Sequence, residues 1–193
     1  MNTALIFGAS GGIGSAVTEL MLQTHTVITV SRQQLDLAGS LPNQQYTDMQ
    51  SVLSHINPDV VINCAGVFAG NFAEVFAVNV SSNWQIIEYY TRYPSIKPVQ
   101  IILVGSSAYH SGRKNYPLYA ASKAALHNLV QGAQEMFAGT QISLSLLHPT
   151  RVNTKMSQQL TSAQHWLTPD HVAAQILAMC NNSSIINEMR YNI

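Results

Sequence analysis

Short apolar runs alternate with longer segments of helical spacing along the whole chain, and this alternation limits the fold more than any other feature. The apolar runs lie at about 3–7, 26–30, 59–63, 99–104 and 141–147, and several are rich in β-branched residues. Strands that alternate with helices form parallel sheets, because each crossover helix returns the chain to the same edge. We therefore predict an α/β fold: a doubly wound parallel sheet with helices on both faces, in three layers.

The predicted helices lie between these strands, and two of them have start signals. We expect helices over 13–23, 47–55, 80–92, 119–137 and 169–179. Asp48 is a suitable N-cap, and Thr168-Pro169 places proline at the first helical position. We also expect a short strand near a sheet edge over 35–37 and a last strand within 185–193.

Length and charge exclude several classes of protein. With 193 residues, of which 47% are hydrophobic, the chain suits one buried core and is too short for two ordinary domains, so we predict a single domain over 1–193. Only 9% of the residues are charged, and nine acidic residues balance nine basic ones. This balance gives no electrostatic reason to expect binding to nucleic acid or to an anionic membrane.

The cysteines and histidines give no metal-binding pattern. Cys64 and Cys180 lie far apart, and the seven histidines share no ligand spacing with each other or with cysteine, so no metal is predicted. His148 precedes Pro149 at the end of a buried strand, where we expect a core histidine. Met1 leads directly into the first strand without a signal peptide or a membrane span, so we expect a soluble cytoplasmic protein.

A glycine-rich turn follows the first strand. Gly8, Gly12 and Gly14 stand where a Cβ would block a tight turn, the approach of a phosphate or the packing of helix on strand. The N–H groups at the start of the next helix favour a pyrophosphate. A turn that binds nothing has the same appearance, so the loop alone does not decide. A Walker-type phosphate loop is excluded, because no Gly-Lys-Ser/Thr follows.

The end of the second strand bears on the type of nucleotide. No carboxylate stands there to accept from a ribose 2′-hydroxyl; Ser31 and Arg32 occupy the place instead. A guanidinium suits a 2′-phosphate, so NADP(H) is favoured over NAD(H). The alternative is that Arg32 is an ordinary surface charge. Asp36 lies just beyond and is a candidate acceptor for the adenine amino group.

Tyr119 and Lys123 lie one turn apart on a predicted helix, so they share one face. A neighbouring cation stabilises a phenolate and brings tyrosine towards general acid/base behaviour. The spacing Tyr-x-x-x-Lys alone is weak, because an amphipathic helix with one exposed lysine shows it too.

Six motifs in order resemble the short-chain dehydrogenase/reductase family in its shorter, non-extended form. They are the loop Gly8 to Gly14, the run Asn63-Cys-Ala-Gly66, Asn79 between two valines, Ser106 after the apolar run 99–104, the pair Tyr119 and Lys123, and the turn Pro149 to Thr154. Ser106 lies thirteen residues before Tyr119, which is the family's usual separation. The resemblance covers nearly the whole chain and implies a Rossmann-type NAD(P)-binding domain that includes the catalytic site.

The resemblance also implies the role of each residue. Tyr119 would be the general acid/base, Ser106 would donate a hydrogen bond to the substrate oxygen, and Lys123 would lower the pKa of Tyr119 and hold the nicotinamide ribose. Asn79 would complete a proton path to Lys123. Ser107 competes with Ser106 for the catalytic place, and the spacing favours Ser106. The implied cofactor-binding residues are Gly8, Ser10, Gly12, Ile13, Gly14, Ser31, Arg32, Asp36, Leu37, Asn63, Ala65, Gly66, Tyr119, Lys123, Pro149, Val152 and Thr154.

The sequence departs from the family pattern in three places. Cys64 replaces an asparagine and Thr150 a glycine, both where the backbone makes most contacts. The span from Gly66 to Asn79 is about ten residues short of the family's habit, which suggests a trimmed helix and a more open site. The tail after Met179 lacks the family's usual glycine-rich ending.

The expected function is therefore an NADP(H)-dependent oxidoreductase that interconverts a carbonyl and an alcohol on a small substrate, with Tyr119 as general acid/base. The alternative is an NADP(H)-binding regulatory or sensor protein with little turnover. The resemblance further implies a homodimer or homotetramer, formed through the helix of Tyr119 and the helix after Asn79. The identity of the substrate stays open, because the loops that would contact it allow many shapes.

Overall fold

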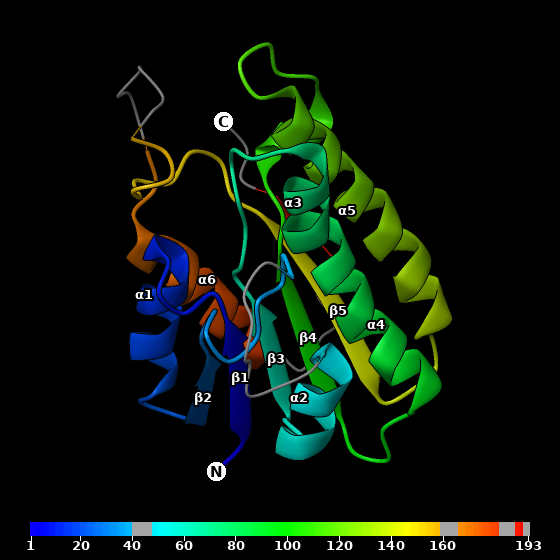
Figure 1. The fold of residues 1–193 in the computed structure, drawn as a ribbon. Helices are drawn as coiled ribbons and strands as arrows, with labels where there is room; N and C mark the ends of the chain where they lie inside the picture. The colour runs from blue at the N-terminus through cyan, green and yellow to red at the C-terminus, as the bar shows by residue number, and fades with distance from the viewer. Residues whose placement is uncertain (40–47, 159–165, 182–187, 191–193) are drawn as a thin grey trace.

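The computed structural model describes residues 1–39, 48–158, 166–181 and 188–190. Within these residues six parallel strands form one sheet in the order β2-β1-β3-β4-β5-β6 (Figure 1). The strands are β1 (Thr3–Phe7), β2 (Thr26–Val30), β3 (Val60–Asn63), β4 (Val99–Val104), β5 (Ile142–His148) and β6 (Glu188–Arg190). The predicted doubly wound fold is confirmed, and the strand order reverses direction between β1 and β3.

Helices cover both faces of this sheet (Figure 1). Helices α1 (Gly12–Met21) and α6 (Pro169–Asn181) pack together on one face, and α2 (Met49–Ile56), α4 (Ser82–Arg92) and α5 (Pro117–Met136) lie on the other. Strand β1 serves both layers, because Ala4 and Ile6 face α1 and α6 whereas Leu5 and Phe7 face the other three helices. Burial of the Leu5, Ile6 and Phe7 side chains contributes roughly 1.5–3 kcal/mol each to folding.

Both predicted helix starts are confirmed. Asp48 caps α2, since its carboxylate accepts from the N–H of Ser51 at 2.8 Å. Thr168 caps α6 through a hydrogen bond from the N–H of His171 at 3.2 Å. Position 47, where the α2 helix was expected to begin, lies outside the described residues.

The expected strand over 35–37 is wrong. This segment forms a turn, in which the Asp36 carboxylate accepts from the N–H of Ala38 at 3.2 Å and Gly39 has a φ of +70°. An aspartate that takes a main-chain N–H two residues on favours a turn over a strand. The expected last strand is present as β6, and the rest of the range 185–193 lies outside the described residues.

The segment after Gly66 contains more helix than predicted. A short helix α3 (Phe72–Phe76) continues through a π-helical turn (Ala77–Ser81) into α4, so the helix expected to start at 80 begins earlier. Its signal is a capping box, in which Asn71 and Glu74 each accept from the other's main-chain N–H. The span is short, as expected, and holds one helix of five residues.

None of the helices in the described part of the chain has the length and apolar character needed to cross a bilayer.

Candidate active site

The candidate residues gather at the carboxyl ends of the parallel strands. The glycine loop follows β1, Asn63 ends β3, Ser106 follows β4, and His148 ends β5. In open α/β sheets the crevice outside the carboxyl ends, where the strand order reverses, is the usual place for a ligand. The fold therefore brings segments from four strand ends to one edge of the sheet.

The glycine loop is closely packed and opens towards the start of α1. Gly8 has a φ of +72°, and a Cβ there would lie 2.5 Å from the N of Ala65. A Cβ on Gly14 would collide with the carbonyl of Gly8, and one on Gly12 would lie 2.6 Å from the Thr154 side chain. Gly8 and Gly14, at the two ends of the loop, are thus required by packing, and Gly12 lies against the Thr154 side chain.

The first turn of α1 is suited to an anion. Gly11 at its N-cap makes no side-chain capping hydrogen bond, and the turn has no acidic residue. Ser10 is exposed in the loop and Ile13 packs against the core below it. Main-chain N–H groups at such a helix start are the donors that bind a pyrophosphate. The residues present therefore fit a dinucleotide.

The turn after β2 places Arg32 and Asp36 together. Arg32 Nε lies 3.2 Å from Asp36 Oδ1, with the Arg32 side chain 66% exposed and the Asp36 side chain 2% exposed. The N–H of Ser31 is bound by the side chain of Gln34 at 2.9 Å, and Leu37 packs against the core. The buried carboxylate thus has partners within its own turn, so an adenine contact by Asp36 stays a prediction.

Tyr119 is half-buried and lies close to Ser106. Burial raises the pKa of Tyr119, and a hydrogen bond with the Ser106 side chain opposes that rise. Ser106 caps the 3₁₀ helix Ser107–His110 with its hydroxyl, while the N–H of Ser107 binds the carbonyl of Pro149 at 2.9 Å. Of the two adjacent serines, Ser106 is thus the one next to the phenol.

Lys123 is buried beside Tyr119. Only 3% of the residue is exposed, Nζ donates to the carbonyl of Val104 at 2.9 Å, and Nζ lies 5.7 Å from the centre of the Tyr119 ring. Burial lowers the pKa of Lys123 to about 8. The expected lowering of the Tyr119 pKa is not its net direction, because burial of the phenol outweighs the opposing effects.

Asn79 joins the two sides of the site from the π-helical turn. Its side chain exchanges two hydrogen bonds of 2.9 Å with the main chain of Val67 and donates to Ser122 Oγ at 3.0 Å. A Cβ on Gly66 would lie 3.5 Å from Asn79 Oδ1 and 3.9 Å from Lys123 Nζ. The structure therefore brings Asn79, Gly66 and Lys123 together.

The remaining cofactor candidates lie on the segments that follow β3 and β5. Asn63 accepts from the N–H of Ala65 at 3.0 Å and donates to Asn83 at 2.9 Å, which fixes the chain after β3. Beyond Pro149, Val152 is buried and Thr154 is held through its N–H by Ser157 Oγ at 3.0 Å.

The aromatic rings of Phe68 and Tyr116 lie next to Tyr119, although nothing in the sequence pairs them. Phe68 lies 5.1 Å from the Tyr119 ring and 4.8 Å from Tyr116, which in turn lies 6.1 Å from Tyr119. The apolar rings help to bury the phenol, and burial is the main cause of its raised pKa. Phe68 follows Gly66 by two residues, but no spacing rule connects it to Tyr119 in sequence.

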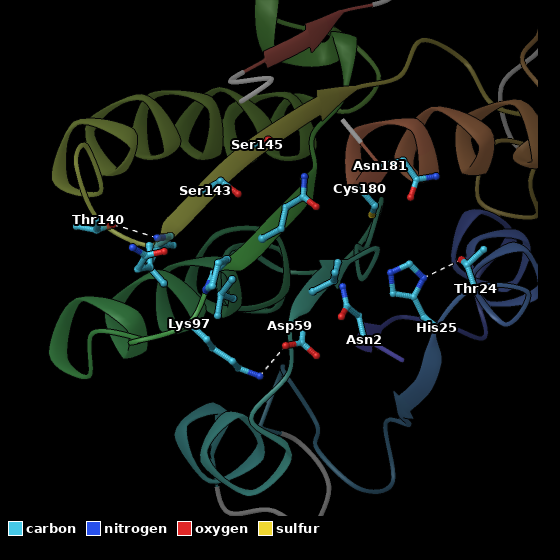
Figure 2. A pocket seen from close by; sticks show the side chains of 16 residues that line it. Asn2, Thr24, His25, Asp59, Lys97, Thr140, Ser143, Ser145, Cys180 and Asn181 are labelled. Carbon is cyan, nitrogen blue, oxygen red and sulfur yellow. Dashed lines mark hydrogen bonds and ion pairs between the residues drawn. The ribbon is translucent and has the colours of Figure 1, made fainter. Parts of the chain in front are cut away.

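A hollow of about 640 Å³ lies at the opposite edge of the sheet (Figure 2). It is lined by the amino ends of β3, β4 and β5, with Asp59, Lys97, Gln100 and His25 among its residues. These polar groups bind one another or the main chain: Lys97 pairs with Asp59 at 2.8 Å, Gln100 donates to the carbonyl of Met179, and His25 contacts Thr24. The hollow is far from Tyr119, and its size does not mark it as the reactive site.

A family model described as short chain dehydrogenase matches residues 44–165. Among curated proteins, the bifunctional ribulose 5-phosphate reductase/CDP-ribitol pyrophosphorylase of Haemophilus influenzae is 24% identical over 162 residues. The match covers 79% of this chain and 34% of that protein, so the chain spans about a third of that relative.

Solved structures show the same fold. A short chain dehydrogenase from Burkholderia cenocepacia in complex with NADP has a TM-score of 0.83 at 17% identity, over 100% of this chain and 88% of that one. The 3-alpha-hydroxysteroid dehydrogenase from Pseudomonas sp. complexed with NADH has a TM-score of 0.82 at 23% identity, over 97% of this chain and 94% of that one.

Proposed function

Because the chain belongs to the short-chain dehydrogenase family, whose members are oxidoreductases, we propose that it interconverts a carbonyl and an alcohol with NADP(H), and that Tyr119 is the general acid/base. The observation that carries the proposal is the grouping of Ser106, Tyr119 and Lys123 at the carboxyl edge of the sheet. A turn that only bound a nucleotide would not need a phenol, a hydroxyl and a buried ammonium together.

The dinucleotide would be held by the loop Gly8 to Gly14, by the turn at Ser31 and Arg32, and by the segments after β3 and β5. When bound, its nicotinamide supplies or accepts the hydride. The exposed Arg32 favours a 2′-phosphate, since guanidinium and phosphate bind in bidentate geometry. The carboxylate of Asp36 shares that cation, so the preference for NADP(H) is expected to be moderate.

This chain's own residues handle the oxygen and the proton. The Ser106 hydroxyl donates a hydrogen bond to the carbonyl oxygen, where negative charge develops during reduction. Tyr119 gives its proton to the same oxygen. Its raised pKa keeps the phenol protonated at neutral pH, which suits the acid role in the direction of reduction. Lys123, at a pKa of about 8, is still mostly charged at neutral pH and stabilises the phenolate that remains.

The substrate is expected to be small and uncharged at its reacting end. Phe68 and Tyr116 present aromatic surface next to Tyr119, and apolar surface of this kind favours substrates with an apolar group beside the carbonyl. As part of the same proposal, we expect the protein to form a homodimer or homotetramer through α4 and α5, which a mass measurement on sizing would test.

A titration with NADPH and with NADH, followed by nicotinamide fluorescence, tests the proposal together with turnover of a panel of ketones. We expect tighter binding of NADPH, and we expect Tyr119→Phe to bind NADPH normally while kcat/KM falls at least about 10²-fold. Tight NADPH binding without turnover of any ketone would favour a regulatory or sensor protein. Unchanged turnover in Tyr119→Phe would exclude Tyr119 as the acid/base.

A further inference from the structure

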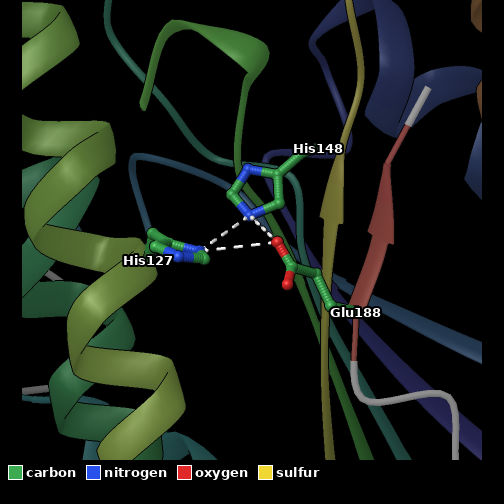
Figure 3. Close-up of side chains that lie close together, drawn as sticks. All are labelled: His127, His148 and Glu188. Atoms are coloured by element: carbon green, nitrogen blue, oxygen red, sulfur yellow. Dashed lines mark hydrogen bonds and ion pairs between the residues drawn. The ribbon is translucent and has the colours of Figure 1, made fainter. Parts of the chain in front are cut away.

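Three side chains behind the catalytic serine converge on one point (Figure 3). His127 projects from α5, His148 from the end of β5, and Glu188 from β6. His127 Nδ1 lies 3.3 Å from His148 Nε2, His148 Nε2 lies 3.2 Å from Glu188 Oε1, and His127 Nδ1 lies 3.5 Å from Glu188 Oε1. These residues are far apart in sequence, which is why their spacing gave no metal motif.

The three distances match the edges of a coordination tetrahedron. Zinc binds histidine nitrogen at about 2.0–2.1 Å and carboxylate oxygen at about 2.0–2.2 Å, so two ligand atoms on a tetrahedron lie about 3.3–3.5 Å apart. An octahedral ion with the same bond lengths would need edges of about 3.0 Å. Two imidazoles and one carboxylate are also a ligand set typical of zinc, which leaves a fourth position for water.

The hydrogen bond on the far side of His148 supports ligation. His148 is 1% exposed, and its Nδ1 lies 3.2 Å from the carbonyl oxygen and 3.3 Å from the main-chain nitrogen of Ser106. In the tautomer with the proton on Nδ1, His148 donates to this carbonyl and presents the lone pair of Nε2, as most metal-binding histidines do; in the other tautomer Nδ1 accepts from the N–H of Ser106. His148 Nε2 faces His127 and the Glu188 carboxylate. Without a proton, Nε2 cannot donate a hydrogen bond to the carboxylate, and a cation bound between the two would be stabilised.

The surroundings of the cluster hold its ligands in place. Arg190 binds both oxygens of Glu188, at 2.6 and 2.7 Å, and so fixes the carboxylate. The Tyr109 ring packs on both imidazoles, at 4.1 Å from His148 and 4.3 Å from His127. The positive charge of Arg190 repels a metal ion bound to Glu188, so it would lower the metal affinity. Glu188 Oε1 still keeps a second lone pair with which to bind the ion.

We propose that His127, His148 and Glu188 form a binding site for a divalent transition metal of the zinc class. The ion would join β6 to β5 and α5, and it would lie one imidazole ring away from the main chain of Ser106. The site is separate from the proposed hydride chemistry: it needs neither cofactor nor turnover, and Tyr119 is not part of it.

The test is a metal titration of the full chain after treatment with a chelator. We expect one equivalent of Zn²⁺ by calorimetry, and with Co²⁺ the intense visible absorption of a tetrahedral site. His127→Asn and Glu188→Gln are the informative variants, because both side chains are partly exposed, at 17% and 23%, and their replacement opens no core. Each variant is expected to lose at least tenfold in affinity and the tetrahedral absorption, whereas His55→Asn, on the exposed face of α2, is expected to bind as the wild type does.

Circular dichroism of each variant checks that it is folded. The proposal is overturned if the wild type shows no saturable binding of one equivalent, which would leave the cluster as a hydrogen-bonded network. It is also overturned if the folded variants His127→Asn and Glu188→Gln bind as tightly as the wild type. Neither result bears on NADPH binding, so failure of this site and failure of the proposed function are distinguishable.

Discussion

A lysine lies at each edge of the sheet, Lys97 at the amino ends of the strands and Lys123 at the carboxyl ends. Their environments are opposite. At the amino edge Lys97 pairs with Asp59 at 2.8 Å and donates to the carbonyl of Asn57 at 2.9 Å, with its side chain 34% exposed. At the carboxyl edge Lys123 is 3% exposed and donates to the carbonyl of Val104. Hydrogen bonding to Lys97 lowers the pKa of Asp59, whereas burial lowers the pKa of Lys123 to about 8.

The difference favours the carboxyl edge as the place of the proposed chemistry. An ion pair that is partly exposed to water keeps much of its hydration. A buried ammonium loses its hydration, and this loss destabilises the folded state. Groups kept in such an environment are candidates for proton transfer. The amino edge has a hollow of about 640 Å³, yet the charges of Lys97 and Asp59 there neutralise each other. The carboxyl edge has the perturbed phenol and ammonium, and this is the edge to test.

Replacement of each lysine by methionine is expected to give the largest contrast. Lys123→Met removes the cation that stabilises the Tyr119 phenolate, so kcat/KM should fall by about 10²-fold or more. Lys97→Met leaves the carboxyl edge untouched and should keep the wild-type rate. Steady-state kinetics with NADPH and a ketone that the wild type reduces measures both.

Equal losses in the two lysine variants would contradict the assignment of chemistry to one edge. So would a folded Lys123→Met protein with the wild-type rate. NADPH binding measured in parallel separates a loss of the cofactor from a loss of the proton-transfer step.

The two adjacent serines offer a finer contrast within the carboxyl edge. Ser106 is hydrogen-bonded to Tyr119, while the N–H of Ser107 is bound by Pro149. Ser106→Ala should lower kcat by about 10²-fold, as loss of one donor to a developing oxyanion does, and Ser107→Ala should change it little. If Ser107→Ala were the more damaging variant, the roles of the two serines would be exchanged.

The pH dependence should follow the same buried groups. In the proposed mechanism, reduction needs a proton on Tyr119 and the charge on Lys123, whose pKa is lowered to about 8. We expect kcat/KM for reduction to be level near neutral pH and to fall above about pH 8, approaching tenfold per pH unit as the cation is lost. A profile that stays level to pH 10 would show that Lys123 keeps its proton when the cofactor is bound.

Much of the fold was predictable from the sequence, because it rests on local signals. The apolar runs predicted β1 to β5, and Asp48 and Thr168 predicted two helix starts. The turn at Asp36 was mistaken for a strand, because two leucines beside one aspartate look like an alternating pattern when their partners are unknown. The trimmed helix expected before Asn79 is present as α3, but its bounds were not predicted, although Asn71 and Glu74 carry its capping box.

The site was predictable where spacing within one element fixed it. Tyr119 and Lys123 share a helix face, and the sequence places them together without knowledge of the fold. The aromatic cover from Phe68 and the meeting of His127 with Glu188 depend on how strands and helices pack, so no local pattern contains them. The net direction of the Tyr119 pKa was missed for the same reason, because burial is a property of the packed site.

Stability should show the smallest effect and the opposite order of the two lysines. Lys97→Met breaks a partly exposed ion pair, so its free energy of unfolding should fall by no more than about 1 kcal/mol, and less at high salt. Lys123→Met removes a buried ammonium, and its lost hydrogen bond to Val104 is offset by the desolvation that is relieved.

The lowered pKa of Lys123 means that the wild type gains stability as pH rises above about 8, since the unfolded chain then binds more protons. Urea unfolding at pH 7 and pH 9 measures this rise, which Lys123→Met should lack and Lys97→Met should keep. The same rise in both variants would mean that another group causes it and that the ammonium of Lys123 is not held at a cost.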